Sequence, residues 1–246
     1  FRIDVPPQIQ STDPIILING QRVRTFSPIS PTGLRLLAFR KYRGLWAPTF
    51  PGKQDGLMTK SHGLQGPIDD AFMSRFLFVL PSGKSSSSEL DEWVESESKD
   101  AIAQWWKQFR GEVRVKRDVD VTPQDIQKGH LILWGDPSSN SILARIHEEL
   151  PIQWSGSQFT IADKRYSTDE ATPVLIYPNP LNPERYIVIN SSFTFSEFSG
   201  GSNSLQVPKL PDWAIVNLNV ARSERHPKGI IDAGFFNEYW QHKTQP

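Results

Sequence analysis

The feature that most constrains this chain is an alternation of short apolar runs with stretches of helical periodicity between residues 75 and 150. The run at 75–80 is almost continuously apolar and precedes a helical pattern over 90–109, and the run at 130–134 precedes a second helical pattern over 142–150. Strands that lack alternating polar positions are buried on both faces. The pattern therefore predicts an α/β fold, with a parallel or mixed sheet that has helices on both faces.

The charge distribution predicts two modules. Residues 1–60 hold nine Lys and Arg against three Asp and Glu, whereas residues 61–246 hold 18 against 24. The first part also contains Asn19-Gly20 between two strand-like runs, which is a strong signal for a β-hairpin. We expect 1–60 to be a small β-rich module, either the tail of an upstream domain or a linker, and 61–246 to be the α/β domain.

The first module carries a basic cluster, and Gly and Pro follow it. The cluster comprises Arg35, Arg40, Lys41 and Arg43, and it is either a solvated strand face or a dock for an acidic domain. Gly and Pro are frequent over 44–67, which indicates the linker between the modules.

Composition excludes several classes of function. The formal net charge is zero, whereas a general nucleic-acid binder is normally basic. The absence of Cys removes disulfides, thiolate zinc sites and cysteine nucleophiles, and no apolar run approaches the roughly 20 residues of a membrane span. The five His residues show no metal-ligand spacing. We expect no nucleic-acid partner, no membrane span, no metal and no cofactor.

Motifs for catalysis are absent or incomplete. A serine hydrolase of the α/β-hydrolase type needs G-x-S-x-G between a strand and a helix, and the chain contains no such pentapeptide. Gly83-Lys84-Ser85 matches half of a phosphate-binding loop, but Phe78 stands where the first Gly is needed. We expect Asp69-Asp70 to make helix caps or hydrogen bonds between elements, and His130 to be a satisfied core or edge residue.

Polar loops that follow apolar strands are the candidate site. In open α/β sheets, ligands bind outside the carboxyl ends of the strands. We expect a possible ligand crevice where three such loops converge, lined by Ser82, Asp136, Ser138, Ser139, Asn140 and Asn179. The alternative is that the Asp, Ser and Asn residues only cap the following helix. No catalytic residue is assigned.

Several long strings resemble the C-terminal region of bacterial multidomain prolyl-oligopeptidase-like serine peptidases or esterases. They are HGLQGPIDDAFM at 62–73, LWGDPSSN at 133–140, LIYPNPLNP at 175–183, NSSFTF at 190–195, PKLPDWA at 208–214 and AGFF at 233–236. In that family this stretch follows the α/β-hydrolase domain, and the nucleophilic Ser and triad His lie upstream, so neither has a counterpart here. The resemblance implies a periplasmic or secreted parent protein.

Two functions remain open, with a third behind them. The first is a non-catalytic C-terminal accessory domain of a multidomain serine hydrolase, whose partner is the upstream catalytic domain of the same polypeptide. The chain begins with neither an initiator Met nor a signal peptide, which fits a fragment of a longer protein. The second is a stand-alone α/β module that binds a carbohydrate, peptide or anion. The third is an enzyme in its own right, built on the strand-end loops.

Overall fold

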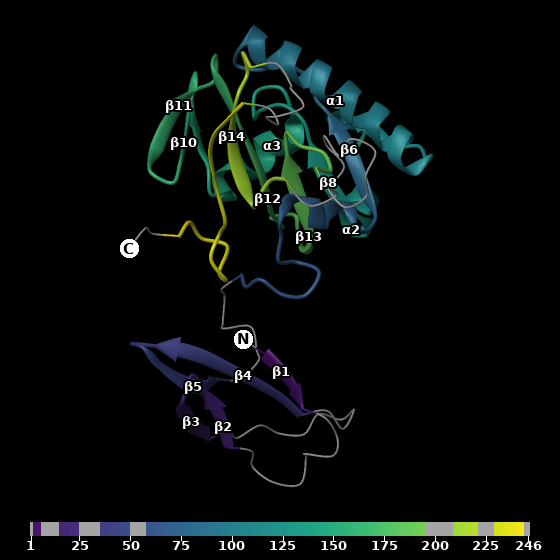
Figure 1. Cartoon of the computed structure of the whole chain (residues 1–246). Coiled ribbons are helices and arrows are strands. Elements are labelled where there is room, and N and C mark those ends of the chain that lie inside the picture. Colours follow the sequence, from purple (N-terminus) through teal and green to yellow (C-terminus); the bar gives the residue numbers. More distant parts are fainter. Residues whose placement is uncertain are drawn as a thin grey trace. The chain divides into compact units, whose positions relative to one another are not determined.

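The chain folds into two compact units, Phe1–Met58 and Thr59–Pro246. We describe them separately, from a computed structural model of the chain (Figure 1). The structure describes residues 2–5, 15–24, 35–49, 58–194, 209–220 and 229–243. The division between the units falls two residues before the boundary that the charge distribution predicts.

The first unit consists of two small antiparallel sheets. Its strands are β1 (Arg2–Val5), β2 (Ile15–Ile18), β3 (Gln21–Arg24), β4 (Arg35–Tyr42) and β5 (Leu45–Thr49). One sheet has the order β1-β4-β5, and the other is the predicted hairpin β2-β3, which turns at Asn19-Gly20 with positive φ at both residues. The strand β5 lies inside the segment that the sequence predicted to be a linker.

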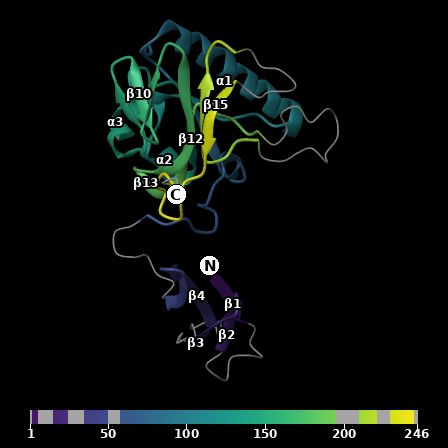
Figure 2. The same cartoon turned by 60° about the vertical axis from the view of Figure 1, so that its left-hand side comes forward.

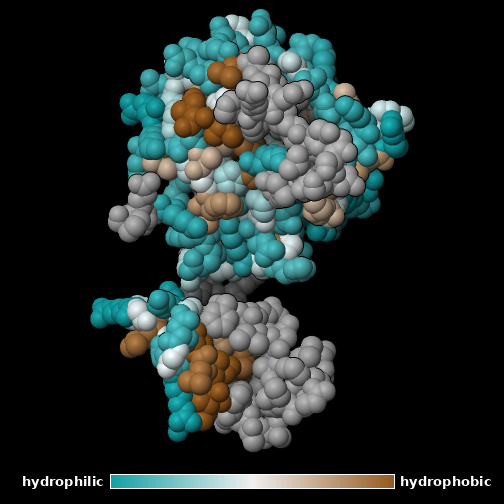
Figure 3. All heavy atoms as spheres, viewed as in Figure 1, coloured by the Kyte–Doolittle hydropathy of each residue, from teal (hydrophilic) through white to brown (hydrophobic). Residues whose placement is uncertain are grey.

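The buried core of the described part of this unit is small. Only Ile18, Val23, Leu37 and Phe39 are buried there, while Leu17 is 71% exposed. Hydrophobic side chains are accordingly visible on the surface of this unit (Figure 3). The described strands therefore contribute little apolar burial of their own.

A mixed seven-stranded sheet forms the centre of the second unit. Its order is β15-β14-β12-β13-β8-β6-β7. The strands are β6 (Phe76–Leu80), β7 (Val115–Arg117), β8 (His130–Leu133), β12 (Ala171–Asn179), β13 (Asn182–Ile189), β14 (Trp213–Asn217) and β15 (Ile230–Gly234). Four neighbours, β13, β8, β6 and β7, are parallel, whereas β12, β14 and β15 join by antiparallel pairing. The predicted mixed sheet is thus present.

Few helices accompany this sheet. The α-helices are α1 (Ser88–Phe109), α2 (Pro123–Lys128) and α3 (Ser141–Ile146), and the 3-10 turns are η2 (Ile68–Phe72), η3 (Asp118–Asp120) and η4 (His147–Glu149). A separate antiparallel sheet contains β9 (Gln153–Ser155), β10 (Gln158–Ile161) and β11 (Lys164–Ser167). The long helix α1 lies along the outside of the unit in two views (Figures 1 and 2).

Helix α1 packs by aromatic side chains near both of its ends. The ring of Trp93 lies 6.4 Å from that of Trp134, which directly follows β8. Near the other end, the ring of Trp105 lies 4.7 Å from that of Phe76, the first residue of β6. The helix therefore runs antiparallel to the parallel strands, from their carboxyl ends back to their amino ends.

The ends of α1 follow capping rules, except that a residue other than glycine ends the helix. Ser87 is the N-cap, and its Oγ accepts a hydrogen bond of 3.2 Å from the backbone N–H of Leu90. Glycine is the usual residue in the left-handed conformation at the end of a helix, and Gly111 is the nearest glycine in the sequence. Instead, Arg110 takes the left-handed conformation, with φ 56°, and its N–H bonds the Trp106 carbonyl. The last backbone bond thus forms one residue earlier than the Gly position suggested.

Replacing the N-cap should destabilise the second unit. Ser87 also donates from Oγ to the Thr168 carbonyl at 3.0 Å and is buried. We expect Ser87→Ala to lower the free energy of unfolding by about 1–2 kcal/mol, since one cap and one buried hydrogen bond are lost. Urea denaturation measures this change. The neighbouring exposed Ser88→Ala is the matched control and should change it by less than about 0.5 kcal/mol. Equal effects of the two substitutions would contradict the assignment.

Candidate functional site: the carboxyl edge of the parallel strands

Five of the six predicted crevice residues lie at one edge of the sheet. The parallel strands β6 and β8 end at the same edge, so the loop at 81–87 and the loop at 134–140 meet there. The backbone N–H of Gly83 donates to the Ser139 carbonyl at 2.9 Å, which joins the two loops directly. A Cβ at Gly83 would lie 3.2 Å from two backbone carbonyl oxygens, so the close approach suits glycine.

Asp136 is the central acceptor of these two loops. Its Oδ1 accepts hydrogen bonds from the Ser138 and Ser139 backbone N–H groups, at 3.1 and 2.9 Å, and from Ser139 Oγ at 2.8 Å. Its Oδ2 accepts from the backbone N–H of Ser86 at 2.9 Å. The residue is only 3% exposed. Its carboxylate therefore stabilises the loops and is turned away from solvent.

Asn140 is the N-cap of α3, as the capping alternative predicted. Its Oδ1 accepts from the N–H groups of Ile142 and Leu143, at 3.0 and 3.3 Å, and its Nδ2 donates to the Trp134 carbonyl at 3.0 Å. Asn140 and Ser139 are buried, and only Ser138 among these loop residues is exposed. Thus the polar atoms of the loop are used for its own architecture.

Ser82 lies next to a buried carboxylate that the sequence analysis did not single out. Asp118 follows β7 and accepts a 2.6 Å hydrogen bond from the Ser141 N–H. Burial acts to raise the pKa of Asp118, but hydrogen bonds from Ser141 and from the Ser82 hydroxyl outweigh it, so this pKa lies below its usual value. The half-buried Ser82 also accepts a hydrogen bond at its carbonyl from Arg117, at 3.1 Å.

Asn190 is a second residue that the sequence analysis missed. It follows β13 with φ 52°, and its side chain makes two hydrogen bonds to Gly135, from the N–H to Oδ1 at 2.8 Å and from Nδ2 to the carbonyl at 2.9 Å. Nδ2 also donates to Thr172 at 2.9 Å. Asn190 opens a formal glycosylation sequon, but the amide that glycosylation would modify is buried and hydrogen-bonded. Its role here is to tie β13 to the loop after β8.

Asn179 does not belong to this site, which corrects the prediction. It ends β12, which pairs antiparallel with β13, so its end lies at the opposite edge of the sheet. Its side chain is fully buried and accepts a hydrogen bond from the Leu181 N–H at 2.9 Å within the turn to β13. An apolar run predicts a strand but not its direction, and that is why the error arose.

The partial phosphate-loop motif is a surface loop. Lys84 has an 88% exposed side chain and pairs with Asp91 at 3.2 Å. Asp91 also accepts from the N–H and Oγ of Ser85, at 2.9 and 2.8 Å. In a phosphate-binding loop, the lysine and a backbone N–H would contact the phosphate. Here Lys84 and the N–H of Ser85 both contact the carboxylate of Asp91 instead.

One Ser–His hydrogen bond occurs among the described residues, and its direction excludes a nucleophile–base pair. Ser74 Oγ lies 2.8 Å from His130 Nε2, while Nδ1 of the same ring accepts from the backbone N–H of Tyr186 at 2.8 Å. A neutral imidazole has one N–H, so accepting at Nδ1 places the proton on Nε2. The ring then donates to Ser74 and cannot take its proton as a general base would.

The aspartates at 69 and 70 make hydrogen bonds between elements, as expected. Asp69 accepts from the backbone N–H and the hydroxyl of Thr194. Asp70 accepts from the Tyr186 hydroxyl at 2.5 Å, and burial together with this bond strongly raises the pKa of the tyrosine. Both carboxylates therefore fasten η2 to the segments beside it.

Other features of the described residues add no binding machinery at these loops. A hollow of about 360 Å³ lies between α1 and residues 218–220, and none of the six predicted residues lines it. No group of three His, Cys, Asp or Glu that could hold a metal occurs in the described ranges. No helix in those ranges is both long and apolar enough to cross a membrane. No family model, curated protein or solved structure matches the chain.

Asn190→Ala should strongly destabilise the unit. The substitution leaves the buried N–H and carbonyl of Gly135 without their partner and puts alanine at a positive φ. We expect a loss of about 2–4 kcal/mol in the free energy of unfolding. Asn190→Gly, which relieves only the backbone strain, should recover about 1 kcal/mol of it. The exposed Asn219→Ala serves as the control, and a loss as small as that of the control would contradict this role.

His130 should make stability depend on pH in a definite window. Burial lowers the pKa of His130 from 6.5 to about 4, with Arg185 contributing to the lowering and Asp70 opposing it. Between these values the unfolded state binds more protons than the folded state, so stability falls as the pH decreases from 6.5 toward about 4. The total loss attributable to this residue is roughly 3 kcal/mol.

The test is urea denaturation across that pH window. His130→Gln keeps a carbonyl oxygen that can accept from Tyr186 but does not titrate, so its stability should decrease less on acidification than that of the unmodified chain. His62→Gln removes an exposed histidine and is the matched control. Parallel pH profiles for His130→Gln and the unmodified chain would exclude this source of pH dependence.

Proposed function

We propose that this chain is a non-catalytic C-terminal accessory region of a multidomain serine hydrolase, with a peptidase- or esterase-like catalytic domain upstream in the same polypeptide. One observation carries the non-catalytic part of the proposal. The single Ser–His hydrogen bond in the described residues runs from the imidazole to the serine, because Nδ1 of His130 accepts the Tyr186 N–H. The sequence resemblance supports the identity of the parent.

The state of the strand-end loops supports the same proposal. A ligand site at these loops would need polar groups free to face the ligand, but Asp136, Asn140 and Asn190 bond to neighbouring protein groups. This favours the accessory function over the alternative of a stand-alone module for a carbohydrate, peptide or anion. We further propose that the accessory fold is an α/β sheet with helices over both faces, as the apolar strands predict.

The isolated chain should therefore have no hydrolase activity. We expect no hydrolysis of nitrophenyl esters above a buffer blank, and no labelling by a fluorophosphonate probe, since the only Ser–His hydrogen bond among the described residues runs from the imidazole to the serine. A known serine hydrolase run in parallel shows that the probe is active. Labelling that disappears in Ser74→Ala would overturn the proposal, because it would show that the Ser74–His130 pair reverses its hydrogen bond.

The parent's chemistry needs a separate measurement. A longer protein that includes the upstream region should be labelled by the same probe, at a serine outside residues 1–246. Labelling of neither protein would leave the chain non-catalytic but would contradict the serine-hydrolase parent.

A further inference from the structure

The amino edge of the parallel strands carries one cationic side chain for each strand. The four parallel strands lie in the order β13-β8-β6-β7. In each of them, a Lys or Arg stands one or two positions before the first residue that takes part in parallel pairing. These side chains, which we call the cation row, are Arg185, Lys128, Arg75 and Arg114. Neighbouring strands lie about 4.8 Å apart, so four adjacent strands hold the row within roughly 15 Å.

The register of the sheet places the members of the row on neighbouring strands, each within two residues of the next along the strand direction. Phe76 pairs with His130, and the N–H of His130 donates to the Arg75 carbonyl at 2.9 Å. Arg185 Nε lies 3.5 Å from the Gln127 carbonyl, next to Lys128. The Arg114 carbonyl accepts from the N–H of Phe78 at 2.9 Å. These contacts join neighbouring strands, although Arg114 is hydrogen-bonded to the third residue of β6 and not to its first.

The cation row is not neutralised by ion pairs. None of its four members pairs with a carboxylate among the described residues, and three of them are exposed, with Arg185 half-buried. The last turn of α1 adds exposed Lys107, and Arg110 follows it. The acidic neighbours in sequence are Glu112 and Glu184, so cations remain in excess.

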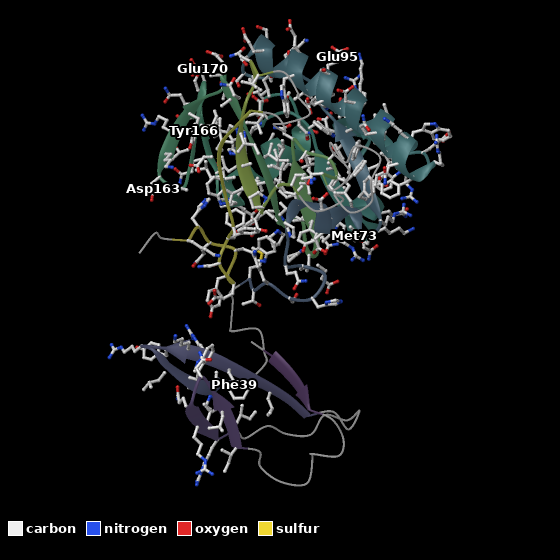
Figure 4. The ribbon with its side chains drawn as sticks, viewed as in Figure 1. Phe39, Met73, Glu95, Asp163, Tyr166 and Glu170 are labelled. Atoms are coloured by element: carbon white, nitrogen blue, oxygen red, sulfur yellow. The ribbon has the colours of Figure 1, made fainter. Side chains whose placement is uncertain are left out.

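Exposed apolar side chains occur on two elements that adjoin the row, the segment before β6 and the last turns of α1. Met73, two residues before Arg75, is 67% exposed, and Trp106 is 52% exposed. Trp106 follows Trp105, whose ring contacts Phe76 at the start of β6. Nitrogen-tipped side chains surround Met73 at this end of the unit, whereas Glu95 and Glu170 lie toward the opposite end (Figure 4). The surface therefore combines Arg, Trp and Met, which are enriched at protein interfaces.

We propose that the cation row, with Met73 and Trp106, is a docking surface for an acidic protein partner whose carboxylates meet the row and whose apolar residues meet the two exposed side chains. Three of the four cations are Arg, whose planar fork matches a carboxylate with two parallel hydrogen bonds. Glu112 and Glu184 beside the row and the zero net charge oppose a polyphosphate, which requires a broad, unmixed basic surface. This inference is independent of the proposed hydrolase parent.

The experiment measures binding of a defined acidic probe to the full 246-residue chain. The probe is a fluorescein-labelled peptide with four Glu-Glu-Phe repeats, followed by fluorescence anisotropy at low salt. The same peptide with Gln in place of Glu tests the need for carboxylates, and labelled oligo(dT) of equal charge tests a nucleic acid. We expect binding of the Glu peptide only, and a decrease as salt increases.

Charge reversals locate the binding surface. Arg75→Glu with Lys128→Glu should weaken binding at least about tenfold, because two attractive contacts become repulsive. The control pair, Lys84→Glu with Arg165→Glu, changes the net charge by the same amount at exposed positions outside the row. It should weaken binding of the Glu peptide less than about twofold. Trp106→Ala should also weaken binding of the Phe-containing peptide, by about three- to tenfold. Equal melting temperatures of the variants show that they are folded. If Arg75→Glu with Lys128→Glu does not fold, the double variant Arg75→Ala with Lys128→Ala replaces it.

Three results would overturn the proposal. They are no binding of the Glu peptide at low salt, equal loss of binding in the two charge-reversal pairs, and tighter binding of oligo(dT) than of the peptide. The last result would assign the row to a nucleic acid instead.

Discussion

Parallel pairing of strands that are apolar on both faces is the constraint on which the rest of the second unit depends. In β6, β8 and β13 the paired residues are almost all buried, and their backbone groups are satisfied by the ladder. Polar side chains are therefore displaced to the two edges of the sheet. The two edges then differ, because the loops at the carboxyl edge are hydrogen-bonded to one another, whereas exposed cations precede the parallel strands at the amino edge.

At the carboxyl edge, residues of the types found in binding sites make most of their hydrogen bonds to neighbouring protein groups. Asp136 accepts four hydrogen bonds and Asn140 caps α3 while it also holds the Trp134 carbonyl. Asn190 then joins this loop to a third strand. Gly135 completes the arrangement with φ 101°, where a Cβ would lie 2.4 Å from Ser139 Oγ. A buried polar atom that is hydrogen-bonded to a neighbouring protein group is not available to bind a ligand.

Local chemistry was readable from the sequence, and long-range geometry was not. The Asn19-Gly20 hairpin, the Thr122-Pro123 helix start with its capping box, and the strand at 130–133 follow from turn, capping and apolar patterns, which act over a few residues. The direction of β12 decided the place of Asn179, and strand direction depends on pairing with residues far along the chain. The role of Asn190 depends equally on β13 lying beside β8. The edge strand β15, with exposed Ile230 and Ile231, lacks the continuous burial of β6, β8 and β14, and its pattern gave no comparable signal.

Hydrogen-bond direction, rather than proximity, separates a structural Ser–His contact from a catalytic one. A base must present an acceptor nitrogen to the serine, and a third group must accept a hydrogen bond from the N–H at the other nitrogen. At His130 the backbone N–H of Tyr186 reverses this polarity, since a backbone donor cannot become an acceptor. Burial and the nearby Arg185 cation further disfavour the charged imidazolium that proton transfer would create. His130 is therefore held as a structural residue, at the same amino edge of the sheet where the cation row precedes the parallel strands.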